Sequence, residues 1–273
     1  MSSEIKIVSV IGAGYMGKQI IDKSAENGYK VRIYDVRSEG LDNFIRKIEE
    51  KKKSKEMYEE VTFHDTLSDA VKDADLIIEA IPEKLELKRE IFSKLDKLAP
   101  PHAIIATNSS SIPVSKLEEA VDRKEKLLNI HFYHLTYRPM ADIMRGTQTS
   151  NETFETGKNW IKSIGIEPIV VKKECFGFVF NRIWRAIKKE CLKIWAGDHA
   201  DIEEVDKAWK IYTGMENGPF RMMDAIGLDV IYDIEMSYYK DSGDPKDKPP
   251  QKLKDMVDMG VLGVKSGKGF YNY

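Results

Sequence analysis

A glycine-rich turn near the N-terminus constrains the fold of this chain more than any other feature. The β-branched segment 5–11 is typical of a buried strand, and the pattern G-x-G-x-x-G follows it directly. A helix is predicted over 15–26, so the turn would join a strand to the N-terminus of a helix. That context is typical of a dinucleotide-binding site. The predicted cofactor-binding turn comprises Gly12, Ala13, Gly14, Tyr15, Met16 and Gly17.

The glycines of this turn and the acidic residue Asp35 together predict NAD as the cofactor. Gly12 permits the tight turn, Gly14 lets the backbone approach a pyrophosphate, and Gly17 lets the helix pack closely on the strand. The helix N-terminus offers N–H groups to the phosphates. Asp35 ends the next predicted strand, where its carboxylate can accept both ribose hydroxyls and would repel a 2′-phosphate. NAD is therefore favoured over NADP. NADP is not excluded, because Arg37 is nearby.

Predicted strands and helices alternate over residues 1–173, and only helices follow. Strands are expected at 5–11, 31–35, 61–63, 75–81, 103–107, 127–133 and 167–171, with helices at 15–26, 41–60 and 84–98 between them. The alternation predicts an α/β fold of the Rossmann type, with a doubly wound parallel sheet. Apolar stripes at 180–194 and 202–212 predict a second, helical core. We expect an NAD-binding domain over 1–173 and a smaller all-α domain over 174–273.

The overall composition excludes several classes of function. The formal net charge is −2, so no basic field favours nucleic acid or an anionic membrane. The apolar segment at the N-terminus is too short for a signal peptide or a membrane span. Cys175 and Cys191 belong to no metal-binding or disulfide pattern. We therefore expect a cytoplasmic protein with no metal and with neither nucleic acid nor membrane as a partner.

Short motifs follow the glycine turn in a specific order and spacing. They are EAIPE at 79–83 with Lys88, TNSSS at 107–111, HF at 131–132, GFVFNR at 177–182, GPF at 218–220, Asp224, GLD at 227–229 and GKGFY at 267–271. Through them, nearly the whole chain resembles the 3-hydroxyacyl-CoA dehydrogenase family of fatty acid metabolism. That family includes short-chain 3-hydroxybutyryl-CoA enzymes and relatives that act on free hydroxy acids, such as gulonate and carnitine dehydrogenases. The resemblance also implies a homodimer.

The resemblance implies a role for each residue that matches a family motif. His131 would be the general acid/base, Ser110 would hydrogen-bond the 3-oxygen of the substrate, and Asn181 would contact the substrate. Cofactor contacts are implied for Glu83, Lys88, Asn108 and Lys265. The chemistry agrees, because alcohol oxidation needs a base for the hydroxyl proton and histidine titrates near neutral pH. Any of the serines at 109–111 could instead cap a turn.

The segment after His131 departs from the family. The family places Asn-Pro three residues after its catalytic histidine and, twelve residues after it, a glutamate that pairs with the imidazole. Here His134 stands at the asparagine position, and Ile143 or, with a one-residue insertion, Met144 stands at the glutamate position. Asp142 is the nearest carboxylate, and on a strand it would share a face with Met144. Asp142, His134 or no residue at all could replace the glutamate.

A second departure is a shortening between the second and third predicted strands. Only about 25 residues separate Asp35 from Val61, where CoA-active members carry a long helical hairpin. The basic run 51–53 could still meet CoA phosphates, and Arg138 or Arg145 could instead bind a free carboxylate. By resemblance, a short-chain 3-hydroxyacyl-CoA is the first predicted substrate, and the shortening makes a small free hydroxy acid the close second. A third hypothesis is an NAD-binding protein with little catalysis.

Overall fold

The chain forms two compact units in the computed structural model, Met1–Val179 and Phe180–Tyr273. The structure describes residues 4–36, 41–54, 58–135, 137 and 139–273, so Arg37 and Arg138 lie outside the described residues. The domain boundary predicted at 173/174 lies a few residues before the second unit begins. Among the described residues, no helix is long and apolar enough to cross a membrane.

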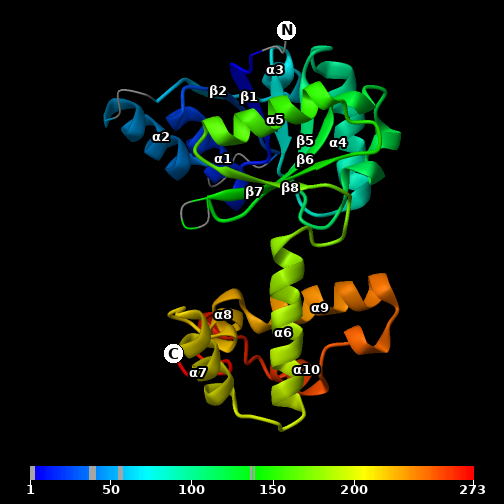
Figure 1. The fold of residues 1–273 in the computed structure, drawn as a ribbon. Coiled ribbons are helices and arrows are strands. Elements are labelled where there is room, and N and C mark those ends of the chain that lie inside the picture. Colours follow the sequence, from blue (N-terminus) through cyan, green and yellow to red (C-terminus); the bar gives the residue numbers. More distant parts are fainter. Residues whose placement is uncertain (1–3, 37–40, 55–57, 136, 138) are drawn as a thin grey trace. The chain divides into compact units, whose positions relative to one another are not determined.

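The first unit is built on an eight-stranded sheet with the order β3-β2-β1-β4-β5-β6-β7-β8 (Figure 1). The strands are β1 (Ile7–Ile11), β2 (Lys30–Tyr34), β3 (Val61–Phe63), β4 (Leu76–Glu79), β5 (Ile104–Thr107), β6 (Leu127–Phe132), β7 (Met140–Arg145) and β8 (Glu167–Val171). Every pair is parallel except β6–β7, which is antiparallel. The sequence did not predict β7 as a strand of the sheet, because Asp142 and Arg145 interrupt its apolar pattern.

Helices cover both faces of this sheet, which confirms the predicted doubly wound fold. Helices α1 (Tyr15–Glu26), α2 (Asp42–Ser54) and α5 (Asn151–Ser163) contribute to one core, and α3 (Leu67–Val71) and α4 (Leu85–Leu98) contribute to the other. Successive residues of β1 serve the two cores, since Val10 belongs to the first and Ile11 to the second. Residues 58–60 are not helical, so the helix expected over 41–60 is shorter than predicted.

The strand order reverses at β1, and this reversal positions the site. Strand β2 pairs with one side of β1 and β4 with the other, so the connections leaving β1 and β4 diverge at their carboxyl ends. In open α/β sheets ligands bind in the crevice that such a divergence leaves. The glycine turn follows β1 and the EAIPE motif spans the end of β4, so both motifs meet at this edge.

The second unit consists of helices around their own core, as predicted. The helices are α6 (Phe180–Ala196), α7 (Ile202–Thr213), α8 (Pro219–Ile226), α9 (Leu228–Ser242) and α10 (Gln251–Asp258). Their core includes Cys191, Leu192 and Phe220. The buried carboxylate of Asp224 fixes the C-terminal segment, because the backbone N–H groups of Phe270 and Tyr271 donate to it at 2.9 Å. The terminal glycine motif therefore serves the packing of this unit.

Candidate active site

The glycines of the first turn differ in what surrounds them. A Cβ on Gly12, whose φ is +102°, would lie 2.6 Å from the carbonyl oxygen of Ala80. A Cβ on Gly17 would overlap the carbonyl oxygen of Gly12. Apart from Gly14 itself and its neighbours in the chain, no described residue places an atom within 4 Å of a Cβ on Gly14, which precedes the first residue of α1. Gly12 and Gly17 are thus required by the protein, whereas Gly14 borders open space suited to a pyrophosphate.

Asp35 lies beside this turn, at the end of β2. The backbone N–H of Ala13 donates to its Oδ2 at 2.6 Å. The hydrogen bond fixes the carboxylate against the loop, at the place where a ribose would follow the pyrophosphate. The arrangement fits the predicted dinucleotide.

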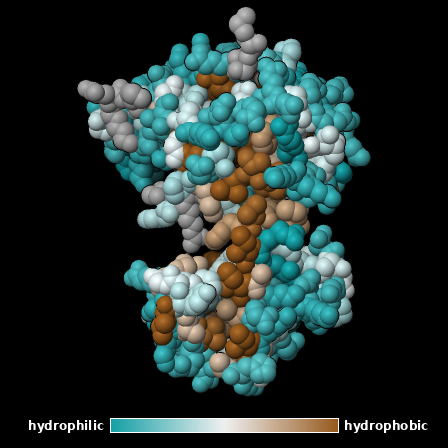
Figure 2. Space-filling view, in the orientation of Figure 1, coloured by the Kyte–Doolittle hydropathy of each residue, from teal (hydrophilic) through white to brown (hydrophobic). Residues whose placement is uncertain are grey.

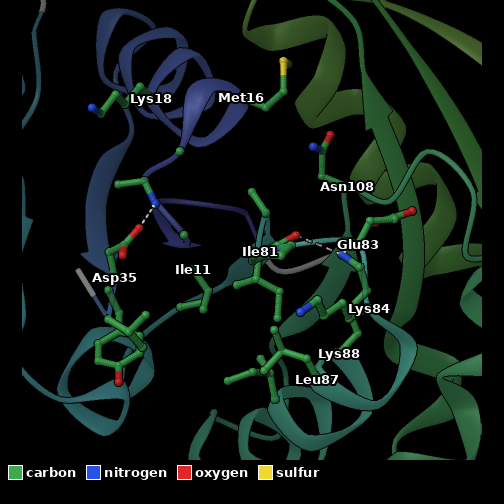
Figure 3. Close-up of a pocket in the computed structure, with 18 of the residues that line it drawn as sticks. Ile11, Met16, Lys18, Asp35, Ile81, Glu83, Lys84, Leu87, Lys88 and Asn108 are labelled. Atoms are coloured by element: carbon green, nitrogen blue, oxygen red, sulfur yellow. Dashed lines mark hydrogen bonds and ion pairs between the residues drawn. The ribbon is translucent and has the colours of Figure 1, made fainter. Parts of the chain in front are cut away.

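The predicted site residues of the first unit converge on one cavity of about 830 Å³. Figure 3 shows side chains from the glycine turn, β2 and α4 around this cavity, with Asp35 on one side and Glu83, Lys88 and Asn108 on the other. The predicted residues that line it are Gly12, Ala13, Gly14, Met16, Asp35, Glu83, Lys88, Asn108, Ser110 and His131. Tyr15 is 68% exposed and, like Gly17, does not line it. Its size and lining are those of a small-molecule or cofactor site.

Lys88 is engaged with carboxylates of the protein. Its ammonium lies 2.6 Å from Oε1 of Glu79 and 3.3 Å from Oε2 of Glu83, and only 1% of the residue is exposed. Glu79 also accepts hydrogen bonds from the Ile81 N–H and the Thr107 hydroxyl, both at 2.8 Å. Sequence analysis assigned no role to Glu79, although an acidic residue ending an apolar strand is a recognisable signal. The ion pair holds the end of β4 against α4.

Glu83 organises the serine run. Its Oε1 accepts hydrogen bonds from the hydroxyls of Ser109 and Ser111 and from the Ser111 N–H. Burial alone would raise the pKa of Glu83, but these hydrogen bonds and the charge of Lys88 lower it below its ordinary value. Glu83 is therefore held as a carboxylate. Ser109 and Ser111 are used in this way, which leaves the exposed Ser110 between them on the cavity wall.

His131 reaches the same cavity from β6. The residue is 7% exposed, and its register partner across the antiparallel pair is Asp142. Nδ1 of His131 lies 3.4 Å from Oδ2 of Asp142, and the hydroxyl of Tyr133 donates to the same oxygen at 2.6 Å. Asn108 links the ends of β5 and β6, because its Oδ1 accepts a hydrogen bond from the N–H of Phe132 at 2.9 Å. The sequence did not single out Tyr133, because its contact with Asp142 depends on the pairing of β6 with β7, a strand that was not predicted.

The two residues that could stand at the family's glutamate position, and the alternative candidate His134, have other surroundings. Ile143 faces the opposite side of the sheet, in the first core. Met144 is fully buried in an apolar cluster with Val171 and Phe178. The ring of His134 lies against Tyr15 and Tyr137, with centroids 5.8 Å and 4.6 Å away.

Two family models match the chain nearly from end to end. Residues 7–175 match the NAD binding domain of 3-hydroxyacyl-CoA dehydrogenase, and residues 177–273 match its C-terminal domain. The chain belongs to the 3-hydroxyacyl-CoA dehydrogenase family. A probable 3-hydroxybutyryl-CoA dehydrogenase of Bacillus subtilis is 32% identical, over 99% of this chain and 98% of the relative.

Solved structures of similar proteins share the fold of this family member. The (S)-3-hydroxybutyryl-CoA dehydrogenase from Ralstonia eutropha gives a TM-score of 0.88 at 30% identity and covers 99% of both chains. A diketoreductase, which catalyses reactions of dicarbonyl compounds, gives a TM-score of 0.86 at 34% identity. The similarity covers 99% of this chain and 100% of the diketoreductase chain. The chain is thus an NAD-binding oxidoreductase of this family, and its relatives differ in the substrates they are named for.

Two lysines that the sequence suggested as contacts for the cofactor or for CoA phosphates have carboxylate partners inside the protein. Lys265 lies 2.6 Å from the carboxylate of Asp229 in the second unit. Lys51 pairs with Asp22 at 2.9 Å and with Glu26 at 3.3 Å. Each of these lysines is therefore paired with a carboxylate of its own unit.

Arg145 and Asn181 complete the set of predicted contacts. Arg145 stacks over the ring of Phe154, with 4.0 Å from its guanidinium carbon to the centroid, and bonds nearby carbonyl groups. It does not line the cavity. Asn181 is partly buried in the first turn of α6, in the second unit.

Proposed function

We propose that this protein interconverts a short-chain 3-hydroxyacyl-CoA and its 3-oxo form. The observation that carries the proposal is that His131 and Ser110 line the same cavity as the glycine turn and Asp35. A general acid/base, a hydroxyl and a dinucleotide-binding turn are the parts that alcohol oxidation requires. The neighbouring Glu83 and Lys88 hold the serine run and the end of β4 in place.

Each residue has one step in this reaction. NAD, held by the glycine turn and Asp35, would supply the acceptor for the hydride of the hydroxyl-bearing carbon, and NADH would supply the donor in the reverse direction. His131 takes the hydroxyl proton as the carbonyl forms, and it donates that proton back during reduction. The hydroxyl of Ser110 hydrogen-bonds the same oxygen and fixes its position. Asn181 from α6 and Lys265 are proposed, on the family resemblance, to contact the substrate and the cofactor.

The test is NADH oxidation with acetoacetyl-CoA, measured beside free acetoacetate and a small panel of oxo acids. We expect turnover on the CoA ester and a loss of about 10²- to 10⁴-fold in kcat for His131→Asn. Lys207→Gln, which changes an exposed helix residue far along the chain, is the matched control. Turnover by His131→Asn at the wild-type rate would remove His131 from the chemistry.

A free hydroxy acid or dicarbonyl compound is the second candidate substrate. One 13-residue helix, α2, is described between β2 and β3, where a long hairpin would hold CoA. The similarity to a diketoreductase points the same way. Activity on the free acids alone would select this candidate. Binding of NADH without turnover on any substrate would instead favour an NAD-binding protein with little catalysis.

We also propose that the second unit forms a homodimer. Figure 2, drawn in the orientation of Figure 1, shows apolar side chains along α6. The exposed apolar residues of α6, α8 and α9 include Ile183 (55%), Ile226 (42%), Val230 (40%) and Ile234 (37%). A second copy of the chain would cover them. Sedimentation equilibrium should report a dimer that Ile183→Glu converts to a monomer, and a monomeric wild-type protein would contradict the proposal.

A further inference from the structure

The pairing of β6 with β7 delivers a carboxylate directly to His131. The antiparallel register places Asp142 opposite His131, so both side chains stand on the same face of the sheet. Asp142 is completely buried, and its Oδ2 lies 3.4 Å from Nδ1 of the imidazole. A buried carboxylate is costly unless it is paired and hydrogen-bonded, and the imidazole is one of the partners that this carboxylate has.

With a one-residue insertion, Met144 stands at the family's glutamate position, and its surroundings are apolar. Met144, two residues after Asp142 and on the same face, packs with Val171 and Phe178 in an apolar cluster. A carboxylate there would be buried among apolar groups. Asp142 stands one same-face step before Met144 along β7, in register with the histidine.

Tyr133 gives Asp142 a second hydrogen-bond donor. Its hydroxyl donates to Oδ2 of Asp142 at 2.6 Å, and its ring stands edge-on to the imidazole with centroids 4.6 Å apart. The ring of Phe178 lies 5.2 Å from the imidazole and helps to enclose it. Oδ1 of Asp142 is buried and has no hydrogen-bond partner among the described residues. The carboxylate is thus oriented through one oxygen, which Tyr133 and His131 share.

We propose that Asp142 and Tyr133 are positioning residues for His131, with Asp142 accepting the Nδ1 proton and Tyr133 fixing Asp142. The inference rests on the proposed function of His131 as the acid/base. A carboxylate can only accept, so Nδ1 carries the hydrogen and Nε2 is left to exchange the substrate's proton. When His131 takes that proton, the adjacent negative charge stabilises the imidazolium. Neither Asp142 nor Tyr133 needs to touch the substrate.

Kinetic measurements test this arrangement, with the substrate that the NADH oxidation assay identifies. We expect Asp142→Asn to lower kcat by about 10²- to 10⁴-fold, because the amide no longer enforces the tautomer. Tyr133→Phe should lower kcat roughly tenfold, which corresponds to loss of one hydrogen bond to a charged group. KM should change little in either variant, since both residues act through His131. Tyr137→Phe, the same change at a residue that is 78% exposed, should match wild type.

The double variant separates positioning from general damage. If Tyr133 acts through Asp142, adding Tyr133→Phe to Asp142→Asn should change kcat by no more than about twofold. Independent losses that multiply would overturn the role of Tyr133. Asp142→Asn with wild-type kcat would overturn the role of Asp142.

A spectroscopic measurement makes the inference independent of the substrate. The ¹⁵N chemical shifts of the imidazole report which nitrogen carries hydrogen, and the chain has only five histidines, so His131→Asn assigns the signal. Neutral His131 should carry hydrogen on Nδ1 in wild type and lose that preference in Asp142→Asn. An unchanged tautomer would overturn the inference. A wild-type protein that shows the Nδ1–H tautomer but turns over none of the substrates would contradict the proposed function alone.

Discussion

Two buried carboxylates in the same sheet have opposite surroundings. Glu79, at the end of β4, meets the ammonium of Lys88 at 2.6 Å and accepts two further hydrogen bonds. Asp142, in β7, has no ammonium or guanidinium partner among the described residues. Its Oδ2 accepts a hydrogen bond from the Tyr133 hydroxyl and lies 3.4 Å from the imidazole of His131, and its Oδ1 has no partner there. Both are fully buried. The protein satisfies the first acid fully, whereas among the described residues it leaves one oxygen of the second without a partner.

The difference separates residues that hold the fold from residues that serve a ligand or a reaction. Buried polar groups are almost always satisfied, so an exception indicates a role beyond stability. The glycine turn repeats the contrast in its backbone. Gly17 is required by a neighbouring carbonyl, and Gly14 faces space that no described residue fills. Substitutions that act on Glu79 and Asp142, and at Gly17 and Gly14, should therefore differ in whether they affect stability or function.

The largest effect is expected from Lys88→Met. Removing the ammonium leaves Glu79 buried without its cation, which should lower the free energy of unfolding by about 3–5 kcal/mol. Lys207→Met is the matched control, because the side chain of this lysine is 63% exposed and, within the described part of the chain, pairs with Glu204 alone. Its loss should be below about 1 kcal/mol. Urea unfolding of both variants gives the comparison, and equal losses would mean that Glu79 is not held by this pair.

The two glycines of the turn should respond to alanine in different ways. Gly17→Ala forces a methyl group against the Gly12 carbonyl and should lower the free energy of unfolding by about 1–3 kcal/mol. Gly14→Ala, at φ −69°, should leave stability nearly unchanged. It should weaken NADH binding roughly tenfold or more, because its methyl group enters the pyrophosphate space. Calorimetric titration with NADH checks this, and tight binding by Gly14→Ala would mean that the cofactor lies elsewhere.

These contrasts also mark how far sequence can predict this molecule. The glycine turn and Asp35 were predictable residue by residue, because their spacing follows from local backbone geometry. The serine run was predictable as a group, but only the structure shows that Glu83 occupies Ser109 and Ser111. The pairing of Asp142 with His131 depends on an antiparallel register between strands, and no local pattern specifies that register.

Glu83 should make stability depend on pH. Its pKa is lowered in the folded state, since hydrogen bonds from Ser109 and Ser111 and the charge of Lys88 outweigh burial. A depressed pKa contributes stability above the unfolded value, about 4.3 for glutamate, and that stability is lost as the pH falls through the folded pKa. The difference in unfolding free energy between wild type and Glu83→Gln should therefore shrink below about pH 4. A difference that stays constant down to pH 3 would contradict this.

The smallest stability effect is expected where the effect on catalysis is large. Asp142→Asn keeps the shape of the side chain and removes a buried charge whose hydrogen-bond partners among the described residues are Tyr133 and His131. Replacing such a charge by a neutral group is often neutral or stabilising, so the free energy of unfolding should stay within about 1 kcal/mol of wild type or rise. Urea unfolding measures it. A loss as large as that of Lys88→Met would place Asp142 among the residues that hold the fold. An unchanged stability would leave the orientation of His131 as the reason for a charge at this position.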